Sequence, residues 1–499
     1  MNYISTRGNF EAVSSARAIK LGMVPTGGLF VPEFLPVLSM NDLANMVNCS
    51  YQEVAEKVLG LYLTDYSAEE IRECIDRAYN GQNFDTPEIA PLFQLNNHTY
   101  FLELWHGPTA AFKDMALQIM PPLLSKAVKK VQSDKEIVIL VATSGDTGKA
   151  ALEGYKNVPG IRIIVFYPYG GVSKVQELQM TTTDGNNTYV VAVKGNFDDC
   201  QNAVKEIFGD PDYNHFLNEH GIELSSANSI NWGRLVPQII YYIWSYLSLV
   251  RQGQINMGDK INIVVPTGNF GNILAGYYAY RMGLPVNKFI CASNENKVLT
   301  DFFRTGEYDR NREFIKTNSP SMDILISSNL ERFLFEVNGH NSELINKWFR
   351  ELNATGVFNI DAETRARIDA ILAAGFATEE ETLATIREVF EKKHYTVDTH
   401  TAVALKVYWD YVKSTKDHTP TVIASTANPF KFNAAVLEAI KGPEAIAGKD
   451  EMAILQELRE VSGMEIHPGL RDLDKKPVRH NRVAAKEELV QEINNILGV

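Results

Sequence analysis

The stretch EIVILVATSGDTG, residues 136–148, decides the fold class. It begins with an almost unbroken run of apolar, mostly β-branched side chains and ends in a turn rich in glycine and hydroxyl groups. A strand that is apolar on both sides is buried on both faces, which is typical of a parallel sheet covered by helices. The sequence therefore predicts a strand over 136–142 that leads through a tight turn into a helix.

Similar apolar runs recur along the chain. They span residues 161–167, 189–193, 261–265 and 421–424. The third continues into PTGNFGN, residues 266–272, and the fourth into STANPFKF, residues 425–432. Because these runs alternate with segments of helical periodicity, we expect an α/β fold with open, mostly parallel sheets covered by helices.

The N-terminal part follows a different pattern. Residues 53–63, EVAEKVLGLYL, place apolar side chains at helical spacing, and Ser67 and Glu70 have the spacing of a capping box. At 499 residues the chain is longer than one core usually organises. We expect a mainly helical N-terminal module (1–95), a large α/β domain (96–120 and 210–440), a smaller α/β domain (121–209) and a C-terminal segment (441–499) that packs on the large domain.

The charge and the cysteine content of the chain limit the kinds of molecule that it is expected to bind. The 48 Lys and Arg residues against 61 Asp and Glu residues give a net charge of −13. Because an acidic surface repels nucleic-acid phosphates and anionic lipids, we expect no nucleic acid and no membrane as partner. The four cysteines lie far apart without a CxxC pair, which argues against disulfides or a thiolate metal site. With no signal-peptide pattern, and with the apolar stretch 235–250 too short to span a bilayer, the sequence favours a cytoplasmic enzyme.

Gly268-Asn269-Phe270-Gly271-Asn272 follows one of the expected strands. In open α/β sheets, ligands bind at the carboxyl ends of the strands, where loops lead into helix N-termini. Glycine lets backbone N–H groups approach an anion closely, and the helix dipole favours negative charge there. The segment is neither a P-loop nor a dinucleotide-binding fingerprint. It predicts a small phosphate site, with a plain strand-to-helix turn as the alternative.

The loop 143–148, TSGDTG, has the same position at the end of another strand. Its backbone N–H and hydroxyl groups could hold a carboxylate, although Ser and Thr at a helix start are also ordinary caps. Lys113 is the third candidate, because it follows a Gly-Pro turn and lies among Ala110, Ala111 and Phe112. Apolar neighbours would lower its pKa, as imine formation with an aldehyde requires. The three features together suggest pyridoxal phosphate acting on an amino acid.

Six motifs occur in order between residues 106 and 432: HGPTAAFKD, ATSGDTGKAA, ANSINWGRL, PTGNFGN, VDTHTAVA and STANPFKF. With YISTRG and TGGLFVPE near the start, the sequence resembles the threonine synthase family, in the longer form typical of bacteria and fungi, over essentially the whole chain. The resemblance implies a fold-type-II pyridoxal-phosphate enzyme. Its reaction would convert O-phospho-L-homoserine and water into L-threonine and phosphate.

The resemblance also implies roles for particular residues. Lys113 would form the Schiff base with pyridoxal phosphate, and Thr426 would face the ring nitrogen. The cofactor phosphate would be bound by Gly268, Asn269, Phe270, Gly271 and Asn272. The substrate would be bound by Ser144, Asp146 and Thr147 at its carboxylate and by Asn228, Ser229 and Arg234 at its phosphate; whether Asp146 contacts the cofactor directly stays open. Pro121 and Pro122 depart from the family pattern and should end or kink the helix that begins at Lys113.

Two alternatives remain at this point. One is another fold-type-II lyase, such as a serine/threonine dehydratase, which would need no second phosphate site. The other is a non-catalytic pyridoxal-phosphate-binding paralogue, against which the intact Lys113 and glycine loops argue. We expect a small-molecule substrate and a monomer or homodimer.

Overall fold

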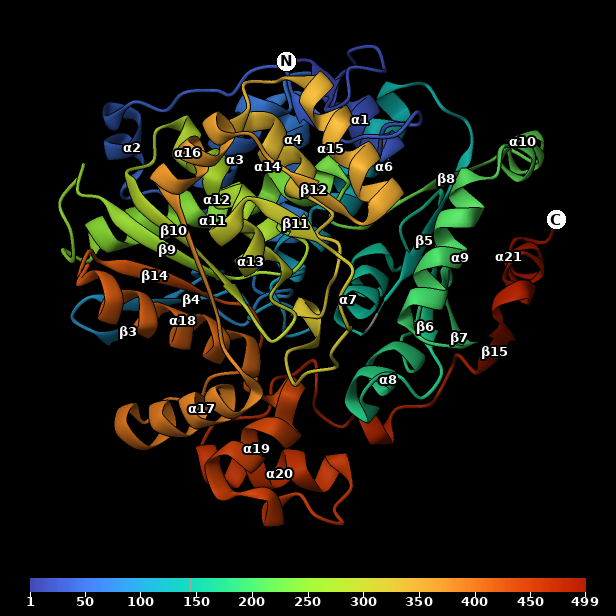
Figure 1. Ribbon diagram of the computed structural model, residues 1–499. Helices are drawn as coiled ribbons and strands as arrows, with labels where there is room; N and C mark the ends of the chain where they lie inside the picture. The colour runs from blue at the N-terminus through green and yellow to red at the C-terminus, as the bar shows by residue number, and fades with distance from the viewer. Residues whose placement is uncertain (144) are drawn as a thin grey trace.

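The computed structural model describes residues 1–143 and 145–499, with the side chain of Asp198 left out. The described residues form four sheets, two of which have only two strands: β1 (Tyr3–Ser5) with β2 (Phe30–Pro32), and β11 (Glu307–Asp309) with β12 (Val357–Asn359). The six-stranded and the five-stranded sheet organise the chain, and in Figure 1 they lie on opposite sides of the molecule. The α/β fold with mostly parallel, helix-covered sheets is confirmed. The predicted strands are all present, and they extend by one or two residues at most beyond the predicted ends.

The larger sheet has six strands in the order β13-β10-β9-β14-β4-β3. They are β3 (Leu92–Asn96), β4 (Thr99–Glu103), β9 (Ile261–Pro266), β10 (Val286–Ser293), β13 (Leu372–Phe376) and β14 (Thr421–Ser425). All pairs are parallel except β3 with β4, so the carboxyl ends of β9 and β14 meet at one edge. The helices around it are α5 (Asp114–Leu117), α6 (Met120–Lys130), α11 (Trp232–Arg251), α12 (Gly271–Met282), α13 (Val298–Thr305), α14 (Leu330–Val337), α15 (Ser342–Thr355), α16 (Ala362–Ile371), α17 (Glu379–Lys393), α18 (Thr399–Thr415), α19 (Asn433–Lys441) and α20 (Glu451–Ser462).

The smaller sheet has five parallel strands in the order β15-β7-β6-β5-β8. They are β5 (Glu136–Ala142), β6 (Ile161–Pro168), β7 (Thr188–Lys194), β8 (Ile222–Ser225) and β15 (Arg482–Ala485). Its helices are α7 (Asp146–Tyr155), α8 (Lys174–Thr181), α9 (Phe197–Gly209), α10 (Pro211–Glu219) and α21 (Leu489–Leu497). Central strands are apolar on both faces, in agreement with the pattern of residues 136–142.

The C-terminal segment, expected to pack on the large domain, divides between the two sheets. Leu455 and Leu458 of α20 are buried in the core that contains residues of α18 and β14, whereas the last part of the segment joins the smaller sheet. β15 pairs with β7, and Leu489 and Ile493 of α21 are buried in the core of the smaller sheet. β8 also joins this sheet although it lies beyond residue 209. A four-residue strand with charged flanks carries little pattern of its own, and sequence periodicity does not identify a distant partner strand.

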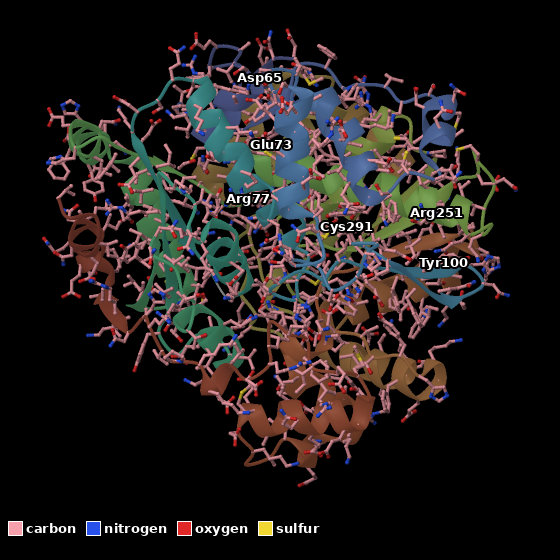
Figure 2. All side chains as sticks on the ribbon, turned by 180° about the vertical axis from the view of Figure 1, so that it is seen from behind. Asp65, Glu73, Arg77, Tyr100, Arg251 and Cys291 are labelled. Atoms are coloured by element: carbon pink, nitrogen blue, oxygen red, sulfur yellow. The ribbon has the colours of Figure 1, made fainter. Side chains whose placement is uncertain are left out.

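The N-terminal module contains β1 (Tyr3–Ser5), α1 (Ser15–Leu21), β2 (Phe30–Pro32), α2 (Met40–Met46), α3 (Tyr51–Tyr62) and α4 (Ala68–Ala78). Ser67 and Glu70 form the predicted capping box of α4. Figure 2 labels two side chains that tie this module to the large sheet's helices: Glu73, which pairs with Lys126, and Arg251, which donates to the carbonyl oxygen of Val47 at 3.2 Å. The module therefore packs directly on α6 and α11.

Two further expectations concern single helices: the helix that follows Lys113, and the apolar stretch 235–250. The helix after Lys113 ends at Leu117, and Pro121 and Pro122 lie in the first turn of α6, where missing N–H groups cost nothing. α11 is buried along almost its whole length. None of the helices in the described residues is both long and apolar enough to cross a membrane.

Candidate active site

A cavity of about 850 Å³ lies at the carboxyl ends of β5, β9 and β14. Its walls come from many parts of the chain, among them the loops after these three strands, the start of α11, residues 21–27, α9 and residues 320–328. The predicted site residues that line it are Lys113, Asp146, Thr147, Asn228, Ser229, Arg234, Gly268, Asn269, Phe270, Gly271, Asn272 and Thr426. Ser144 lies outside the described residues. One cavity thus brings together all the described residues that the sequence singles out.

Lys113 lies at the start of the short helix α5 and is 9% exposed. Its Nζ donates to Ser321 Oγ at 3.2 Å and lies 3.7 Å from Asp146 Oδ2. Burial lowers the pKa of Lys113 to about 8; Lys431 and Arg234 lower it as well, and Asp146 opposes them. A substantial fraction of the amine is therefore neutral and nucleophilic near neutral pH.

Asp146 begins α7 and is buried beside Lys113. Its Oδ1 lies 2.9 Å from Nζ of the fully buried Lys431 and accepts from Gln176 Nε2 at 3.1 Å. Burial alone raises the pKa of Asp146, but Lys431 and Lys113 outweigh it and hold the pKa well below its usual range. Asp146 is thus an ionised carboxylate between two lysines. The sequence analysis missed the role of Lys431 as counter-ion, although it lies within the quoted STANPFKF motif.

A hydrogen-bonded chain reaches Lys113 from the opposite wall. The backbone N–H of Ser321 donates to His400 Nε2 at 3.2 Å, and His400 Nδ1 lies 3.0 Å from Asp398 Oδ1. Asp398 also caps α18, because its side chain accepts from the backbone N–H groups of His400 and Thr401. Ser321 carries no signal in the sequence, because it belongs to a loop without a recognisable motif.

The loop 268–272 is shaped for an anion. Phe270 adopts a left-handed conformation (φ 63°), and α12 begins directly after it at Gly271, which lines the cavity. The N-terminus of α12, with the free backbone N–H groups of its first turn, therefore lies at the cavity. A Cβ on Gly268 would lie 2.4 Å from the carbonyl oxygen of Ser321, so only glycine fits. Asn272 Oδ1 accepts from Tyr241 and Tyr242, whereas its Nδ2 is buried without a hydrogen-bond partner among the described residues. This orphan donor at a helix N-terminus fits a phosphate group.

Arg234 supplies a second cationic group in the same cavity. Its side chain is buried, and one Nη donates to the carbonyl oxygen of Ala227. Nε is buried with no hydrogen-bond partner in the part of the chain described. Burial lowers the pKa of Arg234 to about 10, so it stays charged at neutral pH. Asn228 and Ser229 line the same cavity, and with Arg234 they form a second set of groups suited to an anion, which borders loop 268–272: a Cβ on Gly271 would lie 3.6 Å from Ser229 Cβ.

Thr426 follows β14 and is also buried on the cavity wall. Its carbonyl oxygen accepts from the backbone N–H of Phe112 at 2.8 Å, which fixes the segment that carries Lys113. The Thr426 hydroxyl is neutral, so it suits an uncharged ring nitrogen better than a protonated one. The lysine, the helix N-terminus with its orphan amide and Thr426 together fit pyridoxal phosphate.

Three protein families match successive parts of the chain, and their descriptions agree with a pyridoxal-phosphate site. Residues 2–79 match "Threonine synthase N terminus", residues 85–426 match "Pyridoxal-phosphate dependent enzyme", and residues 401–493 match "Threonine synthase, C-terminal". The second match covers more than half of the chain, including every predicted site residue.

Individual relatives point the same way. Threonine synthase of Saccharomyces cerevisiae is 35% identical over 517 residues, which cover 98% of each chain. Human threonine synthase-like 1 is 43% identical over 438 residues, or 85% of this chain, but the match spans only 58% of that longer protein. The crystal structure of pyridoxal-phosphate-bound threonine synthase from Brucella melitensis superposes with a TM-score of 0.87 at 34% identity, over 100% of this chain and 99% of that one. The chain therefore belongs to the threonine synthase family of pyridoxal-phosphate-dependent enzymes.

Proposed function

We propose that this protein converts O-phospho-L-homoserine and water into L-threonine and phosphate. The observation that carries the proposal is a single cavity that contains Lys113, whose pKa is lowered, together with two neighbouring sets of groups suited to anions. One set, loop 268–272, suits the cofactor phosphate. The other, around Arg234, suits the phosphate of the substrate, which a dehydratase acting on serine or threonine would not require.

Pyridoxal phosphate, when bound, withdraws electrons from the substrate and so makes protons at Cα and Cβ acidic. In our proposal Lys113 first holds the cofactor covalently and then serves as the base that accepts these protons. Its pKa of about 8 suits both tasks, because the amine gains and loses a proton near neutral pH. Ser321 Oγ, 3.2 Å from Lys113 Nζ and 3.5 Å from Asp146 Oδ2, keeps the amine oriented after release.

Asn228, Ser229 and Arg234 bind the substrate phosphate and hold it as it leaves from Cγ. Thr147 and the neighbouring backbone at the start of α7 bind the substrate carboxylate, together with Ser144, which lies outside the described residues. Asp146 acts on Lys113 in this proposal, because an ionised carboxylate repels the carboxylate of the substrate. Thr426 faces the ring nitrogen of the cofactor.

The decisive experiment incubates the purified, cofactor-loaded protein with O-phospho-L-homoserine and measures threonine and inorganic phosphate. Equal amounts of both products support the proposal. Formation of a 2-oxo acid from serine or threonine, with no turnover of phosphohomoserine, would favour a dehydratase. No product at all would favour a binding paralogue.

Two variants separate the roles of the lysine and the arginine. Lys113→Ala should abolish the absorbance band of the Schiff base, and borohydride reduction should label Lys113 only in the unaltered protein. Arg234→Gln should weaken phosphohomoserine binding by about ten-fold or more while leaving that band intact, because a charge-assisted bidentate contact is lost. An unchanged KM in Arg234→Gln would contradict the phosphate role.

We further infer that the protein works in the cytoplasm as a monomer or homodimer. The four cysteines are free in the structure, which suits a reducing compartment. Sedimentation velocity would give the oligomeric state.

A further inference from the structure

A second cavity, of about 660 Å³, lies behind the segment that carries Lys113. Five parts of the chain form it: the link after α4, the turn after β4, one face of α7, residues 182–184 after α8, and the C-terminal segment around residues 467–479. It is lined by none of the residues that line the active-site cavity. The proposed reaction makes no use of it.

His467 is the buried polar group of this cavity, with 5% of its surface exposed. The backbone N–H of Gly469 donates to His467 Nδ1 at 3.0 Å, so Nδ1 carries the lone pair. In a neutral imidazole the proton then resides on Nε2. Burial lowers the pKa of His467 to about 4, which keeps the ring neutral.

The Nε2–H of His467 has no acceptor. The nearest carboxylate oxygen, Asp85 Oδ2, is 3.8 Å away, beyond hydrogen-bonding distance, and Nε2 is buried without a hydrogen-bond partner among residues 1–143 and 145–499. A buried donor left unpaired costs free energy. A ligand that accepts a hydrogen bond would remove that cost.

The charges around the cavity favour an anion. Lys149 and Lys156 are paired with acidic neighbours, Glu153 and Asp184. Lys476 and Arg479 also line the cavity, and neither forms an ion pair with any residue that the structure describes. Asp85 also lines the cavity as a carboxylate, 3.8 Å from His467 Nε2, and is paired with His106 at 2.6 Å. The groups without an ion-pair partner among the described residues are therefore one buried N–H donor and two exposed cations.

We propose that this second cavity binds a small anion, a carboxylate or a phosphate, with the Nε2–H of His467 as the buried donor and Lys476 and Arg479 at the entrance. The segment 107–113 connects the second cavity to the active-site cavity, since its first residues line the one and Lys113 lines the other. Gly469 packs so closely on Pro108 that a Cβ there would lie 2.1 Å from the Pro108 carbonyl oxygen, and the Thr109 carbonyl oxygen accepts from Lys431. The inference does not depend on the reaction proposed above.

The test measures binding to the cofactor-loaded protein by isothermal titration calorimetry, with malonate as the carboxylate probe and inorganic phosphate as the phosphate probe. The phosphate arm uses the Arg234→Gln background, so that the active-site cavity does not contribute. Saturable binding that His467→Asn weakens is expected for either probe, and the tighter of the two identifies the chemistry of the second cavity, because binding at the active-site cavity does not depend on His467. If neither probe binds with a Kd below about 10 mM, the proposal is overturned.

A matched pair of variants tests the donor. His467→Asn keeps an acceptor for the Gly469 N–H but has no donor at the Nε2 position, and should weaken binding about ten-fold or more. His467→Gln keeps a donor near that position and should bind within a few-fold of the unaltered protein. Lys476→Gln with Arg479→Gln, both exposed, should weaken binding and reduce its salt dependence. Binding that His467→Asn leaves unchanged overturns the assignment, and a circular dichroism spectrum confirms that the variant is folded.

Discussion

At the scale of single residues, Lys431 sets the charge balance around the candidate Schiff-base lysine. It is fully buried, and its Nζ lies 2.9 Å from Asp146 Oδ1 and donates to the Thr109 carbonyl oxygen at 2.9 Å. Removing one partner of a buried ion pair leaves an uncompensated charge and typically costs about 3–5 kcal/mol, whereas removing both is often nearly neutral.

We therefore predict that Lys431→Met raises the pKa of Lys113. The variant loses a repelling cation and leaves Asp146 facing Lys113 alone, so both effects favour the protonated amine. The pH midpoint for Schiff-base formation with added pyridoxal phosphate, followed by absorbance, should move above its value near 8. Lys431→Arg keeps the charge and should move it less. A midpoint unchanged in Lys431→Met would disprove the coupling.

If Lys431→Met does not fold, the double variant Lys431→Met/Asp146→Asn provides the second measurement. It removes both charges of the buried pair, so its free energy of unfolding should be closer to that of the unaltered protein than Lys431→Met is. Urea unfolding of the three proteins gives the comparison. If the single and the double variant lost the same free energy of unfolding, the interaction between Lys431 and Asp146 would not account for the loss.

His106 makes stability depend on pH. Burial by itself lowers its pKa, but hydrogen bonds with Asp85 and Glu103 raise the pKa to about 9 from 6.5. The folded protein therefore binds this proton more tightly than the unfolded chain does. The protonated His106 therefore stabilises the folded state by at most about 3 kcal/mol. This stabilisation is complete below pH 6.5 and is lost as the pH rises through about 9.

We predict that the free energy of unfolding falls between pH 6.5 and 9 and that His106→Gln flattens this dependence. Urea unfolding at several pH values measures both slopes. A slope that is identical in the variant would assign the effect to other groups.

The sequence predicted residues with their own chemistry better than residues that act through others. Lys113, Arg234 and loop 268–272 lie in sequence motifs whose residue types indicate a chemical role, and all of them line one cavity. Ser321 and the pairing of Lys431 with Asp146 were missed, because each depends on contacts between segments far apart in the chain.

At the scale of elements, the approach of loop 268–272 to the loop of Ser321 is close enough to exclude any side chain at Gly268. Gly268→Ala would place a methyl group 2.4 Å from the Ser321 carbonyl oxygen and push the two loops apart. We predict a loss of pyridoxal-phosphate affinity of about ten-fold or more, measured by fluorescence titration of the apoprotein.

Gly60→Ala is the control for that substitution. Gly60 lies within α3 and has no neighbour within 4 Å of an added Cβ. The change should leave cofactor affinity unaltered and stabilise the protein by about 0.5–1 kcal/mol, because alanine favours the helix. Unchanged cofactor affinity in Gly268→Ala would show that the loop can move aside.

The elements themselves were largely predictable. The strands of 136–142 and 261–265 are apolar on both faces, and the capping box at Ser67 marks the start of α4. β15 was not foreseen, because its residues pair with β7 and its short sequence has no periodicity that identifies that partner.

At the scale of the whole molecule, the C-terminal residues complete a sheet that is begun in the first third of the chain. Leu489, Ile493 and Leu497 of α21 pack into the core of that sheet, and Arg162 on β6 donates to the carbonyl oxygens of Ile496 and Leu497. Each large apolar side chain contributes about 1.5–3 kcal/mol by burial. Their sum is comparable to the stability of an ordinary domain.

We predict that a chain ending at residue 481 loses the fold of the smaller sheet and aggregates through the open edge of β7. Limited proteolysis and size-exclusion chromatography would detect both effects. Val490→Ala, on the exposed side of α21, should leave the protein folded and monodisperse. A truncated chain that stays folded and unaggregated would show that β15 and α21 are dispensable.

The pairing of β15 with β7 has a consequence for biosynthesis (Figure 1). On the ribosome, β5, β6 and β7 emerge long before the strand that closes their edge. The smaller sheet therefore stays incomplete, with the edge of β7 unpaired, until residues 482–485 have left the exit tunnel. During that interval we expect a chaperone to bind the exposed edge. A nascent chain stalled shortly before that point contains most of the residues of the protein and still lacks a complete smaller sheet.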